Sequence, residues 1–214
     1  MKTLLLAPAL LLTCTSALAQ SKPPSSNSTD KPAAALPTDR HEGLSISADP
    51  YVDAARCKEK FGKADPLKIG ILPIEIFIRN ESAQAIRVNL ETLQLEVRHP
   101  SGTRQDIDWL SADEVAKEIV HPGGAKTPQR SRLPVPMPMP SKDKNVQKLL
   151  EILVPLTLDA DMVAPKGTLH GFLYFNVNHD VSVVKHATLY VPDVTVAPTN
   201  KVLMFFEVPL GSAE

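Results

Sequence analysis

The chain has 214 residues, of which 23 are Lys or Arg and 24 are Asp or Glu, so its formal net charge is −1. This balance offers no basic surface to a phosphate backbone, and we expect no nucleic-acid partner. The 9 glycines are too few for a flexible low-complexity protein, and an aromatic content of 5% leaves few side chains for stacking platforms.

Residues 1–19 have the order of charge, apolar run and small residues that is typical of a secretory signal peptide. The single cation Lys2 precedes the apolar residues 4–12, and a small-residue tripeptide ends at Ala19. We therefore expect cleavage between Ala19 and Gln20. The mature protein is then periplasmic or secreted.

A lipid anchor at Cys14 is the alternative interpretation of this segment. Residues 11–14, Leu-Leu-Thr-Cys, resemble a bacterial lipoprotein box, whose cysteine carries the lipid that holds the protein at the outer membrane. Thr13 fits the box poorly, because a smaller Gly or Ala usually stands there, so ordinary cleavage is preferred. The apolar run is shorter than the roughly 20 residues of a membrane span, and we expect no transmembrane span.

Residues 20–41 are rich in Ser, Pro and Lys and have almost no large apolar side chain. Such a segment buries too little surface to offset the entropy of ordering, so we expect a disordered linker. Residues 42–214 are long enough for one domain with one core. Cys57 is the one cysteine left after cleavage, so no internal disulfide is expected.

The first half of the domain predicts a strand, a helix and a long strand. Residues 43–48 predict the first strand, and Asp49 is the expected N-cap of a helix that ends near Gly62. Apolar residues alternate over 69–78 but change parity. We expect a bulge or bend at residues 70–73, because an extra residue moves the apolar set to the other face.

The next strand signal, residues 86–97, has a second change of parity at residues 91–92. Ser111 and Glu114 then have the spacing of a capping box, which predicts a helix to about residue 120. This helix opens an expected helical insertion at about residues 110–155.

The insertion continues with a proline-rich segment at residues 122–140. Its alternate prolines exclude a helix and favour polyproline II or an irregular surface crossing. Ser141 is the expected cap of a second helix, whose apolar residues recur at helical spacing until Pro155.

Three more strands are expected at residues 168–177, 187–196 and 201–209. The first of these is apolar on both parities, which is typical of a central strand. Because strands and helices do not alternate along the chain, the pattern favours a mainly β fold. We predict an antiparallel immunoglobulin-like sandwich of about seven strands with a helical, proline-rich insertion in the middle.

The strand at residues 74–82 ends in Ile-x-Ile-x-Ile-Arg-Asn-Glu-Ser, and Ile-Arg-Val-Asn-Leu follows at 86–90. With the signal peptide and the polar linker, this order resembles exported bacterial immunoglobulin-like proteins of unknown function. In such modules the strand often ends in an Asn beside a small polar residue, here Asn80 and Ser82. The resemblance covers residues 68–98 best and supports fold and compartment. It implies no catalytic residue and no ligand.

The residues give little support for catalysis. No G-x-S-x-G motif occurs, so no nucleophile elbow is expected. Cys57 lies between Arg56 and Lys58, whose charges favour a thiolate, but a free cysteine on a helix more often packs against a sheet. We expect no catalytic residue and no cofactor.

Two further features are candidates for binding. Met137 and Met139 are two thioethers of the kind that bind Cu(I), although apolar cover over the sheet is the preferred interpretation. Trp109, the one tryptophan, suits stacking on a sugar, although a staple or core anchor before the helix is preferred. With Val135, these three are the candidate partner-binding residues.

These observations favour an exported, non-enzymatic structural or partner-binding module. Its expected partner is a protein or another component of the cell envelope. The alternative is a carrier of a small ligand or copper in the periplasm. The proline-rich segment is the expected place of function, because long loops on a rigid sheet often bind ligands.

Overall fold

The structure is a computed structural model that describes residues 36–123 and 143–211. The chain separates into a unit of residues Met1–Ala33 and a unit of residues Ala34–Glu214, and the second unit is described here. The expected signal peptide, most of the expected linker and nearly all of the proline-rich segment lie outside the described residues.

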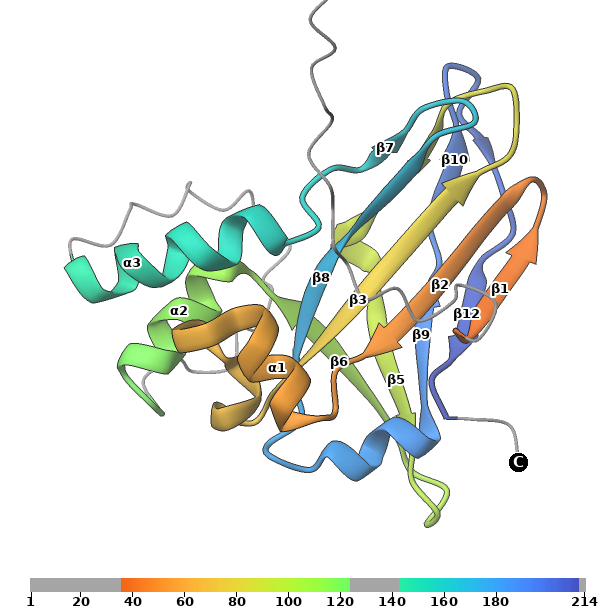
Figure 1. The fold of residues 1–214 in the computed structure, drawn as a ribbon. Coiled ribbons are helices and arrows are strands. Elements are labelled where there is room, and N and C mark those ends of the chain that lie inside the picture. Colours follow the sequence, from red (N-terminus) through yellow and green to blue (C-terminus); the bar gives the residue numbers. More distant parts are fainter. Residues whose placement is uncertain (1–35, 124–142, 212–214) are drawn as a thin grey trace, which may run out of the picture. The chain divides into compact units, whose positions relative to one another are not determined.

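A large antiparallel sheet of eight strands forms the centre of this unit (Figure 1). Its strands, in spatial order, are β1 (Thr38–His41), β2 (Leu44–Pro50), β3 (Ile71–Asn80), β8 (Thr168–Asn176), β6 (Arg104–Leu110), β5 (Gln94–Arg98), β9 (Ala187–Val191) and β12 (Phe206–Pro209). A smaller sheet consists, in order, of β11 (Lys201–Val202), β10 (Val194–Val196), β4 (Ile86–Val88) and β7 (Met162–Val163).

The large sheet nearly closes on itself, because its edge strands β1 and β12 are linked by side chains. The backbone N–H of Glu207 donates to Oδ2 of Asp39 at 2.9 Å. The ring of His41 stacks on Phe206 with 3.8 Å between the centroids. The expected linker extended to residue 41, so its end is corrected: the segment gains order through β1, which pairs with β2.

The inner cluster is the larger of two apolar clusters, and it contains side chains of both sheets. It is built from alternate residues of most of the strands, so one face of each of these strands is buried in it. Its largest members include Leu44, Ile46, Leu72, Ile74, Ile76, Ile78, Leu95, Leu173, Phe175, Leu189 and Phe206.

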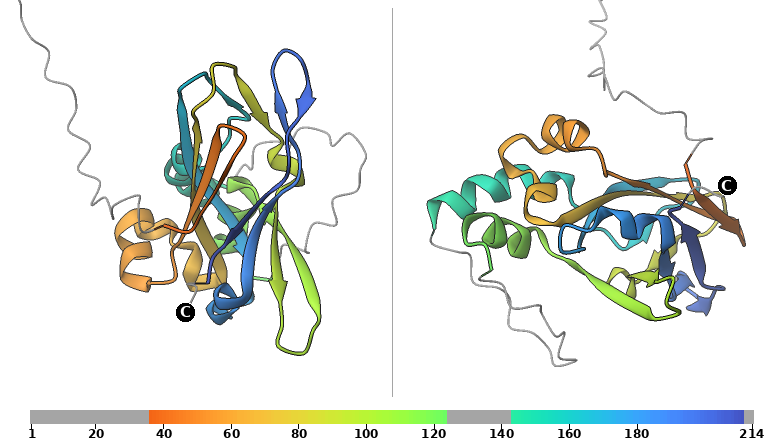
Figure 2. Two further views of the ribbon diagram at one scale, coloured as in Figure 1. Left: turned by 90° about the vertical axis from the view of Figure 1, so that its right-hand side faces the viewer. Right: turned by 90° about the horizontal axis from the view of Figure 1, so that it is seen from below.

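The outer cluster lies where three helices cover the other face of β3 and β8 (Figures 1 and 2). The helices are α1 (Ala54–Phe61), α2 (Ala112–Val120) and α3 (Lys144–Leu153). The buried members of the cluster are Tyr51, Cys57, Phe61, Ala64, Ile71, Ala112, Val115, Ala116, Val146, Leu153, Phe172 and Tyr174.

Strand β8 contributes side chains to both clusters. Leu173 and Phe175 belong to the inner cluster, and Phe172 and Tyr174 belong to the outer cluster. The prediction that this strand is central because it is apolar on both parities is therefore confirmed. It lies between β3 and β6 in the large sheet.

Of the bulge or bend expected at residues 70–73, the bulge is wrong and the bend lies at Gly70. Strand β3 pairs with β8 in an unbroken register from Ile71 to Arg79. The change of parity has another cause: Ile71 faces the outer cluster, and Ile69 ends a 3-10 turn (η3, Pro66–Ile69) before the strand begins. Gly70 makes the turn with a φ of 78°, a conformation that favours glycine.

The second change of parity marks a real break. Residues 86–97 form β4 and β5 in different sheets, separated by the 3-10 turn η4 (Leu90–Thr92). The same happens twice near the C-terminus, where the two expected strands at 187–196 and 201–209 each divide into two. The described residues thus form twelve strands rather than about seven.

The helix caps are partly as expected. The capping box of Ser111 and Glu114 is present and opens α2, and Gly62 ends α1. Asp53 caps α1 in place of Asp49, which lies in β2 instead. Helix α3 begins after Asp143, whose carboxylate accepts from the N–H of Asn145.

A mainly β, antiparallel fold is confirmed, with α2 and α3 inside the expected helical insertion.

The turn after β3 depends on Asn80, which is 1% exposed. Its amide donates to the carbonyl of Gln84 at 2.7 Å, and its Oδ1 accepts from the N–H of Ser82 at 2.9 Å. None of the helices in the described ranges is long and apolar enough to cross a membrane.

Candidate functional site

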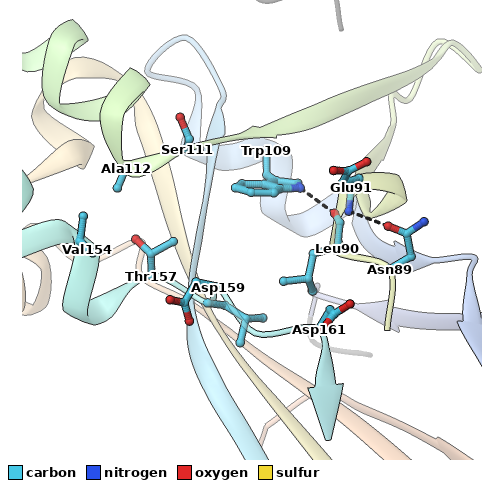
Figure 3. A pocket seen from close by; sticks show the side chains of 11 residues that line it. Asn89, Leu90, Glu91, Trp109, Ser111, Ala112, Val154, Thr157, Asp159 and Asp161 are labelled. Atoms are coloured by element: carbon cyan, nitrogen blue, oxygen red, sulfur yellow. Dashed lines mark hydrogen bonds between the residues drawn. The ribbon is translucent and has the colours of Figure 1, made fainter. Parts of the chain in front are cut away.

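A cavity of about 480 Å³ opens where the helical layer meets the sheet (Figure 3). We call it the Trp109 pocket. Three segments line it: the turn η4, the junction of β6 and α2, and the connection from α3 to β7. The lining residues are Asn89, Leu90, Glu91, Trp109, Ser111, Ala112, Val154, Thr157, Leu158, Asp159 and Asp161.

Hydrogen bonds of Asn89 fix the first segment. Its Oδ1 accepts from the N–H of Glu91 at 3.1 Å, which caps the turn η4. Its Nδ2 donates to Oδ2 of Asp193 at 2.9 Å, beside strand β10. The start of the turn is therefore tied to the residue that precedes β10, which fixes the position of the Leu90 carbonyl that follows.

Trp109 uses one of those carbonyl groups. It lies near the end of β6 opposite Phe175, and its Nε1 donates to the carbonyl oxygen of Leu90 at 2.7 Å. The half-buried ring packs against the inner cluster and forms a wall of the pocket (Figure 3). Its orientation is set by the hydrogen bond and by packing together, as is usual for buried tryptophans.

The second segment continues from Trp109 into the first turn of α2. Ser111 and Glu114 hold this turn through the capping box, in which Oε2 of Glu114 accepts from the N–H of Ser111 at 2.7 Å. Ala112 then joins the pocket to the outer cluster.

The third segment crosses β8 at a glycine. The N–H of Leu158 donates to the carbonyl of Phe172 at 3.0 Å, which brings the segment against the strand. A Cβ atom at Gly171 would lie 2.7 Å from the backbone nitrogen of Leu158, closer than real contacts allow. The far wall of the pocket, including Thr157 and Asp159, therefore depends on the absence of a side chain at Gly171.

The lining of the pocket is acidic. Glu91, Asp159 and Asp161 carry carboxylates, and none of the lining residues is Lys, Arg or His. Asp161 pairs with the exposed Arg87, with 3.4 Å between Oδ2 and Nε. Of the residues that the structure describes, none forms an ion pair or side-chain hydrogen bond with Asp159. In Figure 3 the two aspartates lie across the pocket from the Trp109 ring.

Of the candidate binding residues expected from the sequence, Trp109 lies in the pocket. It also packs against the inner cluster, which fits the interpretation as a core anchor. Val135, Met137 and Met139 lie outside the described residues. Copper binding by the two methionines stays a prediction, and an anaerobic Cu(I) titration against a micromolar chelator tests it.

Sequence reasoning missed the three carboxylates of the pocket. In the sequence, Glu91 marks only the change of parity in the strand pattern, and Asp159 and Asp161 follow a helix without any motif. Asp159 and Asp161 do stand out as two acidic residues between apolar ones, but nothing in the sequence places them beside Trp109.

Cys57 is buried in the outer cluster, and its thiol donates to the carbonyl of Tyr51 at 3.2 Å. Burial raises the pKa of this thiol to about 12, so the protonated and unreactive form is favoured. This placement agrees with a cysteine that packs against the sheet.

Within residues 36–123 and 143–211, no three His, Cys, Asp or Glu side chains gather closely enough to hold a metal ion.

Comparison with known proteins adds little to this geometry. No protein-family model and no curated protein matches the chain. Among solved structures, a functionally unknown protein from Listeria monocytogenes EGD-e is similar at 12% identity. The match covers 72% of this chain and 70% of that one, with a TM-score of 0.33.

Proposed function

We propose that this chain is an exported, non-enzymatic binding module that takes its ligand in the Trp109 pocket. The observation that carries the proposal is the position of Trp109. A large aromatic side chain is held by a hydrogen bond to Leu90 at the wall of a cavity of about 480 Å³.

The size and construction of the pocket support this function. Ligand pockets typically have volumes of about 300–1,000 Å³ and combine apolar walls with a few fixed polar groups. Here Leu90 and Val154 supply apolar surface, while Asn89 and Ser111 are held by their own hydrogen bonds. Elements anchored in this way position a ligand with little loss of entropy on binding.

The absence of catalysis is proposed from the roles of the polar groups. Ser111 is the one hydroxyl of the lining next to a helix start, and this hydroxyl donates to the Glu114 carboxylate at 2.8 Å within the capping box. That pairing holds a helix end and has no histidine beside it in the pocket lining. The sequence, with no G-x-S-x-G motif, supports the same interpretation.

Export and an immunoglobulin-like fold remain parts of the proposal. The signal-peptide pattern of residues 1–19 supports export, and the intact mass of the mature protein tests it. A start at Gln20 supports a free protein, whereas a diacylated Cys14 supports a membrane anchor. Antiparallel pairing and the Asn80 turn support the immunoglobulin-like class.

Trp109 allows a direct test of binding, because it is the one tryptophan of the chain. We expect its fluorescence and its indole N–H resonance to change on addition of at least one of two six-carbon probes, hexylamine and 1-hexanol. Val154→Phe should block the pocket and abolish these changes. Val52→Phe is the matched control, because Val52 is 45% exposed, close to the 52% of Val154, and does not line the pocket.

Two results contradict the proposed function. In one, neither probe changes the signal of Trp109 in the wild-type protein. In the other, Val154→Phe and Val52→Phe respond to the probes alike.

A further inference from the structure

We infer that the ligand of the Trp109 pocket is an organic cation, an ammonium or guanidinium group carried on an apolar stem. This inference rests on the proposed function and adds the chemical class of the ligand. Four observations carry it: the acidic lining, the state of Asp159, the apolar wall beside it, and the separation of the carboxylates.

The charge of the lining is of one sign. Glu91, Asp159 and Asp161 bring three carboxylates to the pocket, and no lining residue carries a positive charge. Like charges around one cavity raise the local concentration of counterions and repel anionic ligands. An anion such as a phosphate or sulfate is therefore disfavoured.

The two aspartates are not equivalent. Asp161 faces Arg87 at 3.4 Å, so an entering cation competes with an existing ion pair there. Asp159 has no such partner among the residues that the structure describes. A cationic ligand gains most by pairing with Asp159, since no ion pair of the protein is lost when it does so.

The apolar part of the pocket lies beside this charge. The Trp109 ring, Leu90 and Val154 offer surface to an alkyl stem. The face of an indole also attracts cations, more strongly than that of a tyrosine or phenylalanine. The combination of carboxylates and a tryptophan is suited to a lysine-like or arginine-like group.

A bare metal ion fits the same residues poorly. Metal ions in proteins need several ligand atoms at about 2.0–2.6 Å from one point. In Figure 3 Glu91 lies on a different side of the pocket from Asp159 and Asp161. Carboxylates spread over a cavity of about 480 Å³ suit a larger cation that contacts them in turn.

The test compares hexylamine with 1-hexanol by isothermal titration of the full mature chain. The two probes share the stem and differ in the charge. We expect hexylamine to bind about tenfold more tightly, the ratio that one exposed ion pair and one cation–π contact together supply. We also expect N-acetyl-lysine methylamide to bind and its neutral norleucine analogue to bind more weakly. Hexyltrimethylammonium distinguishes a quaternary headgroup from a primary amine.

The variants assign the preference to residues. Asp159→Asn should reduce the preference for hexylamine about threefold. Asp161→Asn should reduce it less, because Arg87 already pairs with the Asp161 carboxylate, which therefore offers less charge to a ligand. Asp108→Asn is the matched control, since it removes the same charge from β6 but does not line the pocket. Circular dichroism verifies that each variant is folded.

The outcomes separate this inference from the proposed function. If 1-hexanol binds as tightly as hexylamine and Val154→Phe still blocks it, the inference is overturned and the binding function stands. If Asp108→Asn lowers the preference as much as Asp159→Asn, the attraction is unspecific and the inference is overturned. If neither probe binds, the proposed function fails as well.

Discussion

The two faces of strand β8 are covered in different ways. Leu173 and Phe175 face an inner cluster whose buried members are all apolar. Phe172 and Tyr174 face an outer cluster that also holds two tyrosine hydroxyls and a thiol. Both faces exclude water equally well, but the outer one has to pair polar atoms as it does so.

The polar atoms of the outer cluster find hydrogen-bond partners among residues at the edge of the cluster. The hydroxyl of Tyr51 donates to Glu75 at 2.9 Å, and Glu75 is itself 9% exposed. Burial and the neighbouring carboxylate raise the pKa of Tyr51, so the hydroxyl remains a donor. Arg56 stacks on the same ring and pairs with Asp49 at 2.8 Å.

The difference shows where a binding site can form in this fold. The inner cluster combines side chains of both sheets, and its buried members are all apolar. The outer layer ends along β6, where Trp109 packs against the inner cluster and Ala112 packs in the outer one. The pocket lies at this junction, where apolar surface and hydrogen-bonding groups meet.

The largest expected effect on stability comes from truncating one phenylalanine in each cluster, which compares the two clusters directly. Phe175→Ala and Phe172→Ala should each lower the free energy of unfolding by about 3–5 kcal/mol, because each removes a fully buried ring. Urea unfolding followed by Trp109 fluorescence and by far-ultraviolet circular dichroism should give coincident transitions. If Phe172→Ala lowers the helical signal before the Trp109 signal changes, the two layers are not one cooperative unit.

Gly171→Ala tests the junction itself. The added Cβ meets the backbone of Leu158 at 2.7 Å, so we expect a loss of about 1–3 kcal/mol from overpacking. The displaced segment should also shift the fluorescence of Trp109. The control is Thr168→Ala on the same strand, an exposed site where the change should stay within about 0.5 kcal/mol. Equal stability of both variants contradicts the close crossing.

Ser111→Ala weakens the start of α2 and so the outer layer alone. Loss of the capping hydroxyl should cost about 1 kcal/mol in urea unfolding. Ser101→Ala, in an exposed turn, is the control and should change stability by less than about 0.5 kcal/mol. A cost no larger than that of the control would show that the capping box contributes nothing to stability.

Ionisation of Cys57 has the smallest expected effect on stability at neutral pH and a clear effect only in alkali. The pKa of the thiol is about 12 in the folded chain, against an ordinary value of 9.0. The unfolded state therefore loses its proton first, and the stability that this thiol contributes is lost as pH rises from about 9 to about 12. At pH 8 we expect no reaction with a disulfide reagent until urea unfolds the chain. Rapid labelling of the folded protein contradicts this placement.

The sequence predicted those elements whose signals are local. Capping by Ser111, the stop at Gly62 and the two-faced pattern of β8 all depend on residues within one turn or one strand, so spacing alone reveals them. Strand β6 was not predicted, because its sequence Arg-Gln-Asp-Ile-Asp-Trp-Leu is mostly exposed and lacks a long apolar alternation. It is a strand because β5 and β8 pair with it.

The sequence by itself determined the mainly β character, the positions of the helices and the burial of the isoleucine-rich strand β3. Only the tertiary structure decided the near closure of the large sheet, the division of the expected strands between two sheets, and the pocket. The physical reason is distance along the chain. Trp109 and Asp159 are 50 positions apart in the sequence, and they line one cavity because Gly171 lets the connecting segment cross β8.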